Sequence, residues 1–205
     1  MVANLLFKNV TVSGLPGAGS STLAKSLAEK LDWNYFCGGD FMRMYAQKIG
    51  HFSTDKKIHH DSSAYDEDFD RKVDYQQRDM VSTSESNVVE SWLSGFFAQG
   101  ISGTLKVLVV CSQDAIRIDR IVNRDGISVE EAKKHIFERE QTNIKNWSKY
   151  YAKEWQEWVV NRGLASNDKP IYFWYPQLYD VVLDTFSLSK EQTLQNVLDK
   201  LGYQA

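Results

Sequence analysis

Between residues 13 and 22 the sequence reads Ser13-Gly14-Leu15-Pro16-Gly17-Ala18-Gly19-Ser20-Ser21-Thr22. An apolar, β-branched run at 10–12 precedes this segment, and an amphipathic pattern follows it as far as Leu31. The order predicts a strand that turns through glycines into the N-terminus of a helix. Glycines let the backbone turn successive N–H groups toward one anion, and the helix dipole adds positive potential there. We therefore predict a phosphate-binding loop, made of Gly14, Leu15, Pro16, Gly17, Ala18, Gly19, Ser20, Ser21 and Thr22.

Two serines at the start of the predicted helix bear on the chemistry of this loop. In the pattern G-x-x-x-x-G-K-[ST], the final hydroxyl contacts Mg²⁺ and the lysine contacts the phosphates. Ser21 occupies the hydroxyl position, so we expect it to bind Mg²⁺. Ser20 occupies the lysine position, so the loop lacks the usual positive charge.

The composition is typical of one globular domain. Of 205 residues, 42% are hydrophobic and 25% are charged, which is enough for a substantial core. The net charge of −3 argues against a surface for nucleic acid polymers, although a phosphate pocket needs only local positive charge.

Cys37 and Cys111 make no disulfide framework and are expected to be reduced. With no signal peptide and no long apolar stretch, we expect a cytoplasmic protein that does not enter the membrane, either a monomer or a homodimer.

Short apolar runs alternate with longer helical patterns along the chain. We predict strands at 9–12, 33–37, 87–90, 105–111 and 180–184, and helices at 21–31, 41–49, 66–83, 113–123, 129–158 and 190–201. Near-continuous apolar runs such as 107–110 are typical of strands buried on both faces of a parallel sheet. The alternation predicts an α/β fold with the ligand at the carboxyl ends of the strands.

Two segments look like insertions into a core formed by 1–40, 85–126 and 178–205. The first, about 41–84, contains His51, His59 and His60, whose spacing matches no known ligand set, so we favour a solvated loop over a metal site. The second, about 127–177, holds four of the six tryptophans and the aromatic run 171–175. For that run we favour packing over stacking on a base. Two such appendages suit an enzyme that excludes water during phosphoryl transfer.

Four of the eight arginines lie between residues 117 and 139. Arg117, Arg120 and Arg124 share one helix face by their i, i+3, i+7 spacing. One interpretation is local pairing with Asp114, Asp119 and Asp125. The other, which we favour, is that some of them close over phosphates together with Arg139, because guanidinium groups bind phosphate through two parallel hydrogen bonds.

Three further side chains stand near predicted strand ends. Asp40 follows the glycines at 38–39 and is expected to cap the next helix or to face the cleft. Arg43, one helical turn later, is expected to bind phosphate. Glu90 ends the strand at 87–90, where it could hold a water of the Mg²⁺ shell or be buried in a salt bridge.

In order and spacing these motifs resemble the cytidylate kinase-like branch of nucleoside monophosphate kinases, particularly the short archaeal-type cytidylate kinases. The resemblance covers most of the chain, through 14–31, 38–43, 70–74, 87–90, 117–124, 128–132, 139–140 and 179–185. It implies a P-loop NTPase fold: a three-layer sandwich with a five-stranded parallel sheet, helices on both faces, and NMP-binding and lid insertions. It also implies transfer of the γ-phosphoryl group of ATP, with Mg²⁺, to CMP or a related pyrimidine nucleotide.

The resemblance also implies roles for individual residues. It implies that the loop 14–22 binds ATP, while the loop motif and the strand end lead us to expect Mg²⁺ at Ser21 and Glu90. The positive charge missing at Ser20 comes from the predicted catalytic arginines, which neutralise the transferred phosphate: Arg117, Arg120, Arg124 and Arg139. The resemblance implies that Arg43 helps to hold the acceptor phosphate, and we predict that Asp40, Asp74 and Trp92 also contact the acceptor nucleotide.

The sequence departs from the family pattern mainly on the acceptor and lid side. Glu90-Ser91-Trp92 stands where the family has Glu-Gly-Arg, and 74–77 lacks the arginines of Asp-Arg-Arg-Gln. Asn146-Trp147 replaces Arg-Tyr. These departures keep two alternatives open: a kinase of a different small acceptor, and a nucleotide-binding protein that has lost catalysis.

Overall fold

The computed structural model describes residues 5–48 and 66–204, and the three histidines of the first insertion lie outside them. Within these residues five parallel strands form one sheet in the order β2-β3-β1-β4-β5. The strands are β1 (Asn9–Gly14), β2 (Asn34–Cys37), β3 (Asn87–Glu90), β4 (Thr104–Val110) and β5 (Val181–Asp184). The central strand β1 pairs with β3 on one side and β4 on the other. Because the connections to these neighbours diverge, a crevice opens at the carboxyl end of β1.

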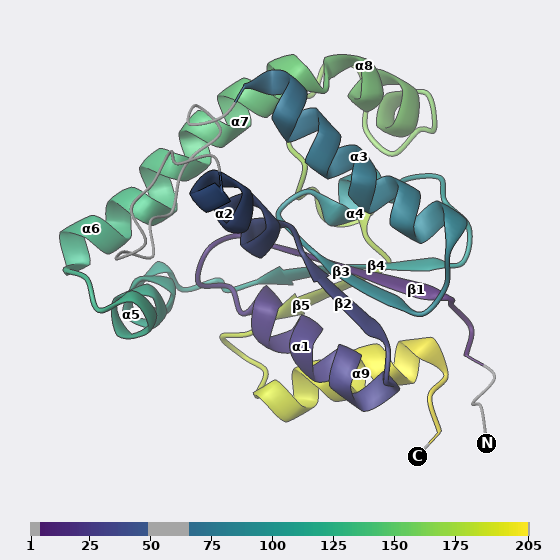
Figure 1. The fold of residues 1–205 in the computed structure, drawn as a ribbon, viewed down its shortest axis with the longest axis horizontal. Coiled ribbons are helices and arrows are strands. Elements are labelled where there is room, and N and C mark those ends of the chain that lie inside the picture. Colours follow the sequence, from purple (N-terminus) through teal and green to yellow (C-terminus); the bar gives the residue numbers. More distant parts are fainter. Residues whose placement is uncertain (1–4, 49–65, 205) are drawn as a thin grey trace.

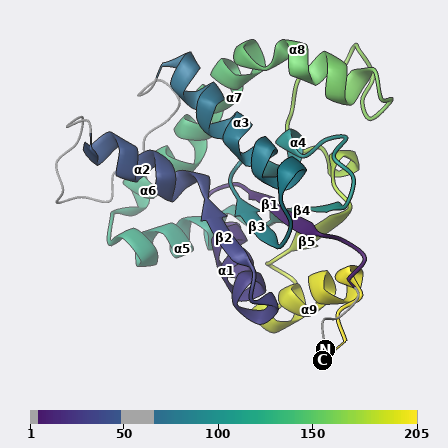
Figure 2. The ribbon, with the colours of Figure 1, turned by 45° about the vertical axis from the view of Figure 1, so that its right-hand side comes forward.

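Helices cover both faces of this sheet (Figure 1). On one face lie α1 (Ser20–Leu31) and α9 (Lys190–Leu201), and on the other α3 (Glu67–Thr83) and α4 (Ser94–Phe97). The other helical elements are α2 (Gly38–Lys48), α5 (Asp114–Asp125), α6 (Val129–Lys133), η2 (Lys134–Glu138), α7 (Arg139–Tyr150), α8 (Ala152–Trp155), η3 (Gln156–Val160) and η4 (Pro176–Leu178). This arrangement confirms the predicted three-layer α/β fold. Figures 1 and 2 both show α2, α5 and α6 beyond the carboxyl ends of the strands.

The two faces of the sheet bury different kinds of side chain. Aliphatic residues, including the fully buried Leu27 and Leu201, fill the space under α1 and α9. Aromatic residues fill the opposite face, where the ring centres of Phe96 and Phe173 lie 4.8 Å apart. Phe173 and Trp174 are both buried here, which confirms packing for this part of the aromatic run. The second insertion is therefore fixed to the sheet by its own aromatic core.

The helix predicted at 129–158 is wrong as a single element. Helical backbone runs from α6 through η2 and α7 to Tyr150, breaks at the fully buried Tyr151, and resumes in α8 and η3. Both η2 and η3 are π-helical. Such π-turns are rare single-turn bulges inside α-helices, and we did not predict them.

Two smaller differences lie at the ends of β2 and β3. The helix α2 begins at Gly38, so Asp40 lies inside its first turn and the predicted N-cap is wrong. The helix α4, which we did not predict, spans four residues, too few to produce a period. No helix in the described part of the chain is long and apolar enough to cross a bilayer.

Candidate functional site

The loop between β1 and α1 depends on glycine at two positions. Gly17 and Gly19 have φ angles of 78° and 101°, which residues with a Cβ rarely adopt. A Cβ at Gly17 would also lie 2.6 Å from the carbonyl oxygen of Arg117. Gly19 is the N-cap of α1 and offers no side chain to its first amides. The start of α1 therefore presents uncapped N–H groups and the positive end of the helix dipole.

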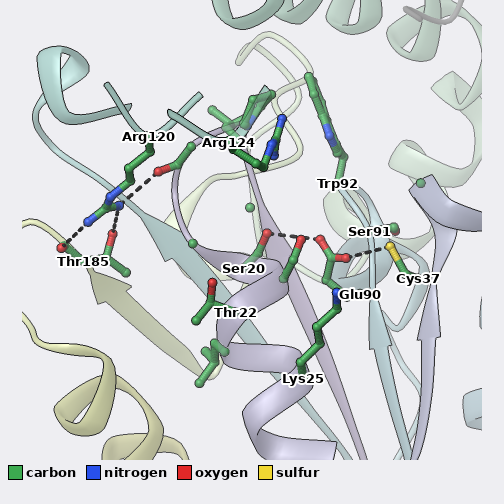
Figure 3. Close-up of a pocket in the computed structure, with 18 of the residues that line it drawn as sticks. Ser20, Thr22, Lys25, Cys37, Glu90, Ser91, Trp92, Arg120, Arg124 and Thr185 are labelled. Carbon is green, nitrogen blue, oxygen red and sulfur yellow. Dashed lines mark hydrogen bonds between the residues drawn. The ribbon is translucent and has the colours of Figure 1, made fainter. Parts of the chain in front are cut away.

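The carbonyl groups of this loop are held from behind. Arg120 Nη1 donates to the carbonyl of Gly17 at 3.0 Å, and Thr185 Oγ1 donates to that of Ala18 at 2.7 Å. Arg120 also donates to both oxygens of Thr185, at 2.8 and 3.0 Å (Figure 3). In a trans peptide unit the C=O and N–H groups point in opposite directions. Because the carbonyl groups of Gly17 and Ala18 face Arg120 and Thr185, the N–H groups of the same peptide units point away from α5.

A cleft of about 640 Å³ lies in front of the loop, at the carboxyl edge of the sheet. Most of the predicted site residues line it: Gly14, Leu15, Pro16, Gly17, Gly19, Ser20, Ser21, Thr22, Asp40, Arg43, Glu90, Trp92, Arg120, Arg124 and Arg139. The structure thus brings together residues from five separate segments of the chain.

Three predicted site residues do not line this cleft: Ala18, Asp74 and Arg117. Ala18 is buried in the aliphatic core. Asp74 accepts hydrogen bonds from Tyr151 at 2.6 Å and Gln77 at 3.0 Å, so it joins α3 to the second insertion. Burial raises the pKa of Asp74 to about 7.

Arg117 lies behind the loop rather than in front of it. Its Nε donates to the Pro16 carbonyl at 3.1 Å, and its terminal nitrogens face Asp114 at 3.1 Å and Glu140 at 3.4 Å. The guanidinium is buried, because Arg117 is only 8% exposed. The structure therefore gives Arg117 a supporting position.

Glu90 receives three hydrogen bonds at one wall of the cleft. Ser20 Oγ donates to Oε1 at 3.1 Å, whereas Cys37 Sγ and Tyr35 Oη donate to Oε2 at 3.0 and 3.4 Å (Figure 3). Burial and the Glu90 charge raise the pKa of Cys37 to about 12 and that of Tyr35 still further. Both groups therefore stay protonated and act as donors. Ser20, at the lysine position of the loop, faces this carboxylate.

Ion pairing differs among the cleft-lining arginines. Arg43 pairs with Asp40. Burial acts to raise the pKa of Asp40, but the hydrogen bond and charge of Arg43 outweigh burial and lower it. Arg124 donates to both oxygens of Asp125, at 2.8 and 2.7 Å. The local ion pairing that the sequence suggested as one interpretation is therefore present at Arg124, as it is between Arg117 and Asp114.

Trp92 forms the upper wall of the cleft with Arg139. The guanidinium of Arg139 lies 4.8 Å from the centre of the Trp92 ring, a cation–π distance. Trp92 packs edge-on against Trp147 and Trp174, with ring centres 5.5 and 5.9 Å away. Trp92, which lies between β3 and α4, therefore contacts the second insertion at the cleft.

The sequence interpretation missed Lys25 and the role of Thr185. Lys25 lies on the exposed face of α1 and lines the cleft. Its spacing of four residues from Ser21 is a signal that the sequence contained, since i and i+4 share a helix face. Thr185 carried no comparable signal, because its contact with Ala18 joins residues 167 positions apart.

Comparison with known proteins places the chain in a family. The profile of the cytidylate kinase-like family matches residues 9–187. A cytidylate kinase of Haloarcula marismortui is 35% identical over 142 residues, covering 69% of this chain and 71% of the relative. One of Methanopyrus kandleri is 30% identical over 193 residues, covering 90% and 88%.

A solved structure shares the fold at much lower sequence similarity. Shikimate kinase from Bacteroides thetaiotaomicron superposes with a TM-score of 0.53 at 13% identity, covering 96% of this chain and 99% of that one. This likeness concerns the fold alone. On the sequence matches, this chain belongs to the cytidylate kinase-like family.

Proposed function

We propose that this protein is a nucleoside monophosphate kinase that transfers the γ-phosphoryl group of ATP to CMP or a related pyrimidine nucleotide. The observation that carries the proposal is the cleft at the end of β1, where the phosphate loop faces cations from α2, α5 and α7. The relatives named cytidylate kinase, one of them similar over 90% of the chain, support the same activity.

The loop would hold the phosphates of ATP. The uncapped amides at the start of α1 and the helix dipole favour an anion there. Arg120 and Thr185 keep the loop in this shape through its carbonyls, so the amides need little rearrangement on binding. Preorganised donors of this kind stabilise charge at low cost in reorganisation.

Ser21 and Glu90 are the groups that fit Mg²⁺. Ser21 is exposed at the first turn of α1, and the Glu90 carboxylate lines the same cleft. In the described residues no three His, Cys, Asp or Glu side chains gather into a metal site. This small donor set suits Mg²⁺, which takes one or two protein oxygens plus substrate phosphates. When bound, Mg²⁺ neutralises phosphate oxygens.

The acceptor would lie between α2 and Trp92. Arg43 is half-buried, and among the described residues its ion-pair partner is the exposed Asp40, so its guanidinium could exchange this partner for the acceptor phosphate. Trp92 provides a flat apolar wall above. Asp74 and Arg117 have no place in this proposal, because neither lines the cleft.

Arg124 and Arg139 would neutralise the charge of the phosphoryl group in transfer. Both line the same cleft as the loop. A phosphate oxygen of CMP is already a nucleophile, so the reaction requires positioning and charge neutralisation rather than a general base.

A coupled phosphotransfer assay with ATP and Mg²⁺ tests the proposal, with CMP, dCMP, UMP, AMP and GMP in parallel. We expect CMP or dCMP to give the highest kcat/KM, and chelation of Mg²⁺ to abolish transfer. Transfer to none of the five, with ATP still bound, would refute the proposal. It would favour another small acceptor or a protein that only binds nucleotides.

A further inference from the structure

The positive charge that the loop lacks at Ser20 has to come from elsewhere in the cleft. A kinase transition state concentrates negative charge between donor and acceptor, and a cation at the loop normally offsets it. Ser20 cannot do so, because its hydroxyl is uncharged, and this hydroxyl donates to Glu90. Any replacement must line the cleft near the start of α1 and be able to leave its present contacts.

Arg120 and Arg124, the two arginines of α5 that line the cleft, satisfy this requirement poorly. Arg120 has four hydrogen bonds to loop carbonyls and Thr185, all between 2.8 and 3.5 Å. Arg124 is bound by both oxygens of Asp125, whose side chain is only 3% exposed. Moving either guanidinium would leave buried acceptors without their donors, which costs about 1–3 kcal/mol each. Both are better suited to stay in place.

Lys25 meets the requirement. It lies four residues after Ser21 and three after Thr22, so the three side chains share a face of α1. Side chains of a helix tilt toward its N-terminus, and four residues correspond to about 6 Å of rise. The four-carbon stem of lysine can therefore bring its ammonium level with the first turn. Figure 3 shows Lys25 extending along α1 toward Glu90.

The ammonium of Lys25 is also available. Among the residues that the structure describes, no carboxylate lies within ion-pair distance of it. Lys25 Nζ lies 5.9 Å from the centre of the Tyr35 ring, a cation–π distance. Its charge contributes slightly to the lowered pKa of Asp40. Such weak contacts leave the side chain free to turn toward an arriving phosphate.

We propose that Lys25 supplies, from the second turn of α1, the cation that the loop position occupied by Ser20 does not provide. This inference rests on the proposed kinase function. An acceptor phosphate oxygen bonds to the γ-phosphorus while the bond to the β–γ bridging oxygen breaks, which yields ADP and the nucleoside diphosphate. Lys25 keeps its protons and contacts the γ-phosphoryl oxygens throughout. Lys25 is therefore a catalytic residue.

The variants Lys25→Met and Lys25→Arg test this role, with Lys30→Met as the matched control. Lys30 is an exposed lysine in the last turn of the same helix and contacts the Tyr203 ring. We expect Lys25→Met to lower kcat by about 100-fold or more, with KM for CMP changed less than threefold and Tm unchanged. Lys25→Arg retains at least tenfold more activity than Lys25→Met, and Lys30→Met stays within twofold of the parent protein. Equal losses in both Lys25 variants, or a loss in Lys30→Met as large, would overturn the proposal.

A binding measurement separates this inference from the proposed function. Because Lys25 contacts the γ-phosphoryl group, Lys25→Met should weaken binding of a fluorescent ATP analogue roughly 10-fold while changing the affinity for the matching ADP analogue less than twofold. Failure of the parent protein to phosphorylate CMP would refute the acceptor but leave this difference measurable. Equal loss of affinity for both analogues would refute the role of Lys25.

Discussion

Arg120 and Thr185 form one network behind the phosphate loop. Arg120 donates to Gly17 and to Thr185, and Thr185 donates to Ala18 at 2.7 Å. Arg120 contacts the loop itself through the carbonyl groups of Gly17 and Ala18, so we expect it to act on the nucleotide through the shape of the loop. Its loss should therefore appear in ATP binding and in stability together.

A double-mutant cycle on this pair tests the network. We expect Arg120→Ala to raise KM for ATP about 10-fold or more and to lower Tm by several degrees, because loop carbonyls lose a charged donor. Thr185→Val should have a smaller effect of the same kind. The double variant should lose less than the sum of the two free energies, since both act on one network. Additive losses would mean that the two side chains support the loop independently.

At the scale of elements, α3 carries a buried carboxylate against the second insertion. Asp70 is 6% exposed, and its Oδ2 has no hydrogen-bond partner among the described residues. Burial raises the pKa of Asp70 from 3.8 to about 7, and the charge of Asp66 adds to this. The folded protein therefore holds this proton more tightly than the unfolded chain does. The resulting stabilisation is complete below about pH 4 and is lost as the pH rises through 7.

Asp70→Asn should remove this pH dependence. At pH 8 we expect the variant to have a higher free energy of unfolding than the parent protein, by an amount on the order of 1–4 kcal/mol, because Asn carries no buried charge. The difference should shrink toward zero as the pH falls toward 4. Urea unfolding at pH 4.5 and 8 measures it. Asp79→Asn, on the exposed face of α3, is the control and should change stability little at either pH. A constant difference for Asp70→Asn would contradict the raised pKa.

The elements that sequence predicted well are those with a strong local signal. The β-branched run at 10–12 and the glycines at 14–19 located β1, the loop and α1. The short apolar runs between helical patterns located every strand to within two residues. The break at Tyr151 was missed; this ring is fully buried in the aromatic core, in contacts that a local pattern does not reveal. The contacts of Arg117 with Pro16 and of Asp74 with Tyr151 were missed because they join residues far apart in sequence.

At the scale of the whole molecule, the cleft has a fixed floor and walls from separate segments. The floor is the centre of the sheet with its loop, and α2 on one side and α5 with α7 on the other contribute side chains above it. A kinase gains by closing such walls, because water would otherwise accept the phosphoryl group. Trp92 is well placed to sense closure, since it contacts Arg139 of α7 and both Trp147 and Trp174.

Tryptophan fluorescence should therefore report acceptor binding through Trp92. Of the six tryptophans, all in the described residues, only Trp92 lines the cleft. We expect CMP to change the emission of the parent protein, and Trp92→Phe to remove more than half of that change, because the other five rings lie outside the site. Trp33→Phe is the control: Trp33 packs against the aliphatic core beside the start of β2, so this variant should keep the full response. A full emission change in Trp92→Phe, together with a lost change in Trp33→Phe, would mean that CMP binding alters Trp33 at the opposite end of the sheet. The acceptor could then not lie against Trp92.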